Sequence, residues 1–185
     1  MAVLILGLVL FLGPHSLKMA VPQGRRALIE RRGAGAVKGI VALSSIVGLV
    51  LLVWGFASTE PVILYAPPQW GRRLAAILVL PALILAVASV APPGYIKRAV
   101  VNPLLLGTIL WAVGHLLSIG DLAGVTLFGA FLVWSIVDWA MQPAVVPITA
   151  PAARSDAIAI VAGVVIYVLL VWRVHMWLFG VAPFA

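Results

Sequence analysis

Long, uncharged runs of apolar residues recur along this chain, and they restrict its fold more than any other feature. Their lengths are close to the roughly 20 residues that an α-helix needs to cross a bilayer. Because backbone N–H and C=O groups inside a bilayer must be paired within the protein, such runs predict helices. The predicted spans are Val3–His15, Gly39–Ser58, Leu74–Val90, Pro103–Ile119, a fifth from Asp121 to Gln142 and a sixth from Ser155 or Asp156 to Gly180.

Composition supports the same fold class. Hydrophobic residues make up 64% of the 185 residues, charged residues only 9%, and the mean hydropathy is +1.22. A soluble domain has roughly 45–50% apolar and about 25% charged residues. We therefore predict an all-α polytopic membrane bundle of about six transmembrane helices, forming a single domain over residues 1–185. The absence of cysteine excludes disulfides and thiolate ligands.

Basic residues predict how the chain is oriented. Six predicted spans place both termini on one side of the membrane. Connectors on the opposite side hold nine of the twelve basic residues, and the side of the termini holds Arg72, Arg73 and Arg173. Because cytoplasmic loops carry an excess of Lys and Arg, both termini are predicted to be periplasmic.

The segment from Pro22 to Gly33 is predicted to be a short amphipathic helix at the membrane surface, since Pro favours a helix start and Gly a helix end. A basic cluster beside membrane spans predicts contact with anionic lipid and not with nucleic acid. The arginines expected to make this contact are Arg25, Arg26, Arg31 and Arg32.

Three histidines lie in apolar runs, where an ionisable side chain is costly and predicts a function or a specific partner. Neutral imidazole is the commonest protein ligand of transition metals and haem iron. His115 shares a helical face with Trp111, and His15 follows Pro14, which should bend the first helix. The alternatives are a hydrogen bond to a neighbouring helix for His115 and an interfacial position for His15. His175 lies among Trp172, Arg173 and Trp177, which is typical of an aromatic belt.

Three charged residues are further candidates. Asp121 follows Gly120 and is predicted to cap the fifth helix more readily than to carry protons. Asp138 lies within the fifth span, where we expect an ion pair with Lys97 or Arg98. Arg173 could meet an anionic group such as a haem propionate, although extension to the outer surface is the commoner role for such a residue.

Several motifs resemble the NnrU family. They are FLGPHSL near the start, the basic segment after it, IKRAVVNPLLLGTILWAVGHLLSIGDL, LFGAFLVWS and the late WRVHMWLFG. The most specific part combines Asn102–Pro103, Trp111, His115 and Gly120–Asp121. The resemblance covers nearly the whole chain. It implies a bacterial inner-membrane protein associated with denitrification and nitric oxide metabolism, with a possible membrane protein partner from that metabolism.

The NnrU family is in turn similar to plant 15-cis-ζ-carotene isomerases, membrane enzymes that use haem b. This similarity implies haem b held by two axial histidines, His15 of a His-Ser motif and His115 before a Gly-Asp turn. Two positions differ: Ala112 replaces a cysteine, and Asn102–Pro103 replaces His-Pro. The leading hypothesis is a haem-binding redox protein. The alternatives are a haem-dependent cis-trans isomerase of a lipophilic polyene and a haem-free assembly or transport partner.

Overall fold

The computed structural model describes residues 1–142 and 150–183, so residues 143–149 of the predicted connector before Ser155 lie outside it. All regular elements in these described ranges are helices, accompanied by one isolated β-bridge between Ile63 and Asp121. Five helices are long and apolar enough to cross a membrane. The protein is therefore an all-helical, multi-pass membrane protein, as the sequence predicts. The chain forms two compact units, Met1–Val62 and Ile63–Ala185.

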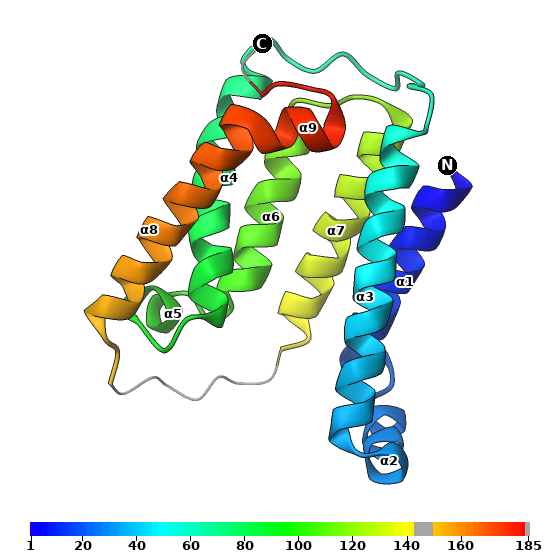
Figure 1. Cartoon of the computed structure of the whole chain (residues 1–185), viewed down its shortest axis with the longest axis vertical. Helices are drawn as coiled ribbons and strands as arrows, with labels where there is room; N and C mark the ends of the chain where they lie inside the picture. Colours follow the sequence, from blue (N-terminus) through cyan, green and yellow to red (C-terminus); the bar gives the residue numbers. More distant parts are fainter. Residues whose placement is uncertain (143–149, 184–185) are drawn as a thin grey trace. The chain divides into compact units, whose positions relative to one another are not determined.

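The first unit is a helical hairpin with a short helix at its bend (Figure 1). It contains α1 (Ala2–Ala20), α2 (Pro22–Arg32) and α3 (Ala34–Ala57). The hairpin is closed at its open end by the Met1 ammonium group, which donates to Oγ1 of Thr59 at 3.0 Å. Glycines let α1 and α3 approach closely: a Cβ at Gly48 would lie 2.8 Å from the backbone nitrogen of Phe11.

Helix α1 passes through Pro14 and continues to Ala20, so the prediction that it ends near His15 was wrong. Proline has no N–H and leaves the carbonyl of residue i−4, here Leu10, without its helical donor. In this unit the hydroxyl of Ser44, on α3, donates to that Leu10 carbonyl at 2.6 Å. The hydrogen bond that Pro14 removes is thus replaced from the neighbouring helix, and α1 can continue.

The second unit holds the remaining helices (Figure 1). Helix α4 packs against both α6 and α8, and α6 also packs against α7. A Cβ at Gly107 of α6 would lie 2.8 Å from the carbonyl oxygen of Ala82, so α4 and α6 are in close backbone contact. The elements are α4 (Gly71–Val90), α5 (Tyr95–Ala99), α6 (Pro103–Leu116), α7 (Leu122–Ala140), α8 (Ala153–Leu169), the π-helical turn η1 (Leu170–Val174) and α9 (His175–Phe179).

Two of the observed elements differ from the predicted spans. The fourth span ends at Leu116 and not at Ile119, which leaves α6 with 14 residues. The connector after α4, where no span is predicted, contains the short helix α5. Its first two amide groups, of Tyr95 and Ile96, donate to the carboxylate of Asp156 at 2.8 and 3.1 Å. This carboxylate at the start of α8 therefore caps α5 from a distant part of the chain.

Candidate functional site

His115 lies in the last turn of α6. Its Nδ1 lies 2.8 Å from the carbonyl oxygen of Trp111, one turn earlier. Because a carbonyl oxygen can only accept, Nδ1 carries the proton, and in the neutral ring the lone pair is on Nε2. Ligating histidines commonly have this arrangement, since a bond from one ring nitrogen to a backbone carbonyl fixes the ring and leaves the other nitrogen for a metal.

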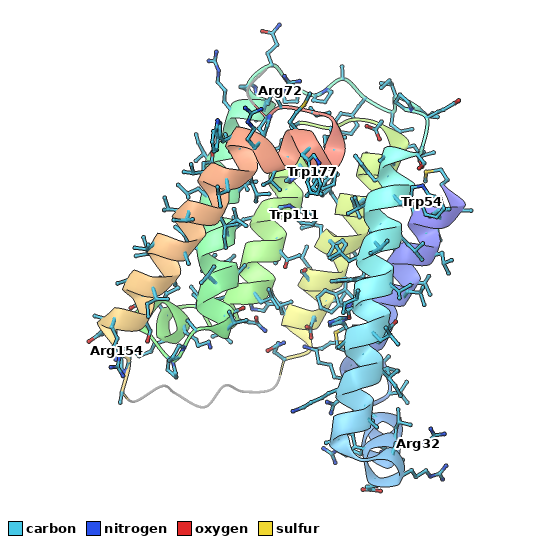
Figure 2. The ribbon with its side chains drawn as sticks, in the orientation of Figure 1. Arg32, Trp54, Arg72, Trp111, Arg154 and Trp177 are labelled. Carbon is cyan, nitrogen blue, oxygen red and sulfur yellow. The ribbon has the colours of Figure 1, made fainter. Side chains whose placement is uncertain are left out.

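An aromatic cluster from α6 and α7 surrounds this histidine. The His115 ring stacks on Phe128, with ring centroids 4.4 Å apart and planes 18° apart, and lies 5.2 Å from Trp111. Trp111, labelled in Figure 2, in turn meets Phe128 and Phe131 edge-on at 4.8 and 5.5 Å. The predicted shared face of Trp111 and His115 is confirmed. These rings give the histidine a flat, apolar and rigid environment.

Two of the polar candidates serve as caps at the starts of α6 and α7. Oδ1 of Asn102 accepts from the amide of Leu105 at 3.2 Å at the start of α6. Oδ1 of Asp121 accepts from the amide of Gly124 at 2.8 Å and caps α7, as the sequence predicts. Both candidates therefore hold the helices that carry His115 and its aromatic neighbours.

A segment of the preceding loop closes over the turn that follows His115. The amides of Leu64 and Tyr65 both donate to the carbonyl oxygen of Gly120, at 2.8 and 3.1 Å. The Tyr65 hydroxyl lies within hydrogen-bond reach of the carbonyl oxygens of Leu116 and Ile119, which share its single proton as acceptors. Of these acceptors, the Leu116 carbonyl is one that the end of α6 leaves without a helical donor, and those of Ile119 and Gly120 belong to the turn that follows. The turn is thus fixed by a segment that is distant in sequence.

His15, in the first unit, has the same local geometry as His115. Its Nδ1 lies 2.7 Å from the carbonyl oxygen of Phe11, four residues earlier. Its ring stacks on Phe11, with centroids 5.2 Å apart and planes 19° apart. The bond again places the ring proton on Nδ1. His15 and His115 therefore share both the tautomer, with the lone pair on Nε2, and the position of the acceptor, one helical turn earlier.

The late tryptophan-rich segment has a different organisation. Nδ1 of His175 donates to the carbonyl oxygen of Val181 at 2.7 Å, across the left-handed turn at Gly180. This bond closes the end of α9. The Arg173 guanidinium lies 5.7 Å from the centre of the Trp172 ring, a cation–π distance. The observed bonds of both residues therefore belong to their own segment.

Asp138 is almost completely buried, with 2% of its surface exposed. Its Oδ1 accepts from the side-chain amide of Gln142 at 3.3 Å. The predicted ion pair with Lys97 or Arg98 is wrong for this structure. Lys97 donates to the carbonyl oxygen of Ala91 at 2.9 Å, and Arg98 lies 5.2 Å from the centre of the Tyr95 ring.

Residues 1–142 and 150–183 contain no group of three or more His, Asp or Glu side chains able to hold a metal ion. A site built wholly from such ligands is therefore not found there. A metal already held by a macrocycle needs only one or two axial ligands, which a histidine such as His115 can supply.

Sequence reasoning missed the residues that complete the surroundings of His115. Phe128 and Phe131 come from another helix, and the spacing of α6 does not predict them. Their separation of three residues in LFGAF does predict a shared face of α7, and that signal could have found them. Tyr65 lies in a proline-rich loop, and no local pattern links it to the end of α6.

Comparison with known proteins gives a family for this chain. No curated protein and no solved structure matches the sequence significantly. The family model described as NnrU protein matches residues 3–183, nearly the whole chain. The chain therefore belongs to the NnrU family.

Proposed function

We propose that this protein is a haem b-binding protein of the bacterial inner membrane, with His15 and His115 as axial ligands of the iron. Its role would lie in redox chemistry connected with denitrification and nitric oxide metabolism. This proposal rests on membership of the NnrU family, on the chemistry of the histidines and on the resemblance of the His15 and His115 motifs to those of haem-binding isomerases.

One observation carries the proposal: His15 and His115 share a local geometry that His175 lacks. In both, Nδ1 donates to the carbonyl group four residues earlier, at 2.7 and 2.8 Å. A bond of this kind selects the tautomer in which Nε2 can bind iron, and it fixes the ring orientation. His175 has the same tautomer, but its Nδ1 donates to the carbonyl group of Val181, beyond the end of its own helix, so its ring is not fixed against the preceding helical turn.

The surroundings of His115 also suit a haem. A macrocycle is flat and mostly apolar, and it binds between apolar helices that supply axial ligands. Phe128 and Trp111 offer flat apolar surfaces within 5.2 Å of the His115 ring. A bound haem would supply one-electron chemistry. The protein's own contribution would be to orient the two imidazoles, and the aromatic cluster would keep water from the His115 ring.

The test is an absorption spectrum of the protein purified in mild detergent, oxidised and then reduced, before and after haem supplementation. We expect a Soret band with sharp reduced α and β bands, which indicate six-coordinate, low-spin haem. His15→Ala and His115→Ala should each lose this low-spin spectrum. His175→Ala is the matched control and should retain it, and circular dichroism should show that all three variants keep their helical content.

Other outcomes would support other functions. If no visible band forms after supplementation, the haem proposal is wrong and a haem-free assembly or transport role becomes the better account. If both alanine variants keep a wild-type spectrum, the ligand assignment is wrong. If the iron is bound but reduction releases one histidine, the spectrum becomes high-spin, and the isomerase alternative is favoured.

A further inference from the structure

We propose that α2, with Lys18 and Lys38 on either side, is a binding surface for the headgroups of anionic phospholipids. This inference concerns a different part of the protein from the proposed haem ligands and does not depend on whether haem binds. It is carried by the position of α2, by the exposure of its charges and by the lack of partners for its arginines within the described residues.

The position of α2 follows from two abrupt changes of chain direction. Only Val21 separates α1 from α2, and only Gly33 separates α2 from α3. Val21 is outside helical geometry, and Gly33 has φ of 81°, a backbone conformation that glycine adopts readily. Since α1 and α3 are both long and apolar enough to cross a membrane, these joints leave α2 directly at the end of two spans. That is the depth at which phospholipid headgroups lie.

Positive charge is concentrated at this end of the hairpin. Lys18 is in the last turn of α1, and Lys38 is near the start of α3. Figure 2 shows Arg32 on α2 at this end and Trp54 toward the opposite end of α3. Between the two lysines, Glu30 is the only acidic residue. The four arginines of α2, all with exposed side chains, are Arg25, Arg26, Arg31 and Arg32.

These arginines have no partner in the part of the chain that the structure describes. None of their side chains makes an ion pair or hydrogen bond with a residue in the ranges 1–142 and 150–183. The packing of α2 against α1 and α3 instead involves its middle, where Ala27, Leu28 and Ile29 are half-buried. The helix is thus held by its apolar residues, and its guanidinium groups remain available to an external anion.

Phospholipid is the anion that fits this location best. A guanidinium group binds phosphate through two parallel N–H donors, and phosphodiester headgroups are always present at the end of a membrane span. A basic residue near an anionic membrane surface contributes about 1 kcal/mol of binding free energy. Loss of two arginines should therefore weaken binding roughly 25-fold, because about 1.4 kcal/mol corresponds to a tenfold change in affinity.

The experiment measures phospholipid binding to the full-length protein in neutral detergent by native mass spectrometry. Phosphatidylglycerol and phosphatidylcholine are titrated separately, and inorganic phosphate is added as a competitor. The test variant is Arg31→Gln/Arg32→Gln. The control variant is Arg72→Gln/Arg73→Gln, which removes two exposed arginines at the start of α4. Circular dichroism and gel filtration check that both variants are folded.

We expect tighter binding of phosphatidylglycerol than of phosphatidylcholine by the wild-type protein, a roughly 25-fold loss in the test variant and less than about a twofold change in the control. Arg31→Lys/Arg32→Lys should keep most of the binding. Equal affinity for the two lipids, or equal losses in both glutamine variants, would overturn the proposal. Displacement of phosphatidylglycerol by millimolar inorganic phosphate would also overturn it, because the site would then bind free phosphate.

Discussion

Replacing Ser44 by alanine tests whether α3 supplies the hydrogen bond that Pro14 removes from α1. The Ser44 hydroxyl donates to the Leu10 carbonyl at 2.6 Å. Without it, this carbonyl has neither its helical donor nor the serine, and an unpaired carbonyl in a membrane span is unfavourable. Measured hydrogen bonds between membrane helices average about 0.6 kcal/mol and reach about 1.7 kcal/mol. Because Pro14 removes the alternative donor, we expect a cost in the upper part of that range, about 1 to 1.5 kcal/mol.

A double-mutant cycle isolates this effect. In Pro14→Ala the new backbone N–H at this position can donate to the Leu10 carbonyl, so the serine is no longer the main donor. Ser44→Ala should then cost only about 0.3 kcal/mol. The difference between its costs in the two backgrounds, the coupling free energy, should be about 1 kcal/mol. The measurement is the free energy of unfolding in mixtures of sodium dodecyl sulfate and mild detergent, followed by circular dichroism.

Ser45→Ala provides the matched control. The Ser45 hydroxyl donates to the carbonyl of Val41 in its own helix at 2.7 Å. Since that carbonyl can also accept from an amide of α3, the loss should stay within about 0.5 kcal/mol. Equal costs of Ser44→Ala in the wild-type and Pro14→Ala backgrounds would refute the reasoning, because the serine would then not be compensating for the proline.

Two further predictions concern the second unit. Gly107→Ala should destabilise the protein by about 1 to 3 kcal/mol, because the added Cβ would lie 2.8 Å from the Ala82 carbonyl oxygen; Gly129→Ala, with no atom within 4 Å of its added Cβ, should be neutral or stabilising in the same unfolding measurement. Asp156→Ala should speed hydrogen exchange at the amides of Tyr95 and Ile96 about fivefold, since a cap contributes about 1 kcal/mol. The matched variant Asp121→Ala should instead speed exchange at the amide of Gly124. Unchanged exchange at Tyr95 in Asp156→Ala would contradict the capping role of Asp156.

Local sequence patterns predict most of the helices and caps of this protein. Apolar run length is sufficient for the long helices, since the bilayer imposes both length and backbone pairing. The cap made by Asp121 is predicted from residue type and position next to a helix start, whereas the equivalent role of Asn102 was not predicted. Pro22 and Gly33 likewise mark the two ends of α2, which is observed at Pro22–Arg32.

The features that sequence reasoning missed depend on contacts between distant residues. The continuation of α1 past Pro14 could not be predicted, because the Leu10 carbonyl accepts a hydrogen bond from Ser44, which lies on another helix. The turn after α6 is held by bonds from the amides of Leu64 and Tyr65 to the Gly120 carbonyl, which no local pattern predicts. At the candidate site, the Nδ1 bonds of His15 and His115 are local and follow from helix geometry, but Phe128 comes from a neighbouring helix.

The shortness of α6 has a consequence for the membrane around it. Its 14 residues span about 21 Å, well below the roughly 30 Å of a hydrocarbon core. Such hydrophobic mismatch makes a bilayer thin locally unless protein fills the missing length. The segment from Ile63 to Tyr65 lies against this end of the helix, and its bonds pair carbonyl groups of the 116–120 turn that water would otherwise have to pair. Carbonyl groups just beyond His115 are thus paired within the protein, which is the condition that a short helix must meet where its end falls within a hydrocarbon core.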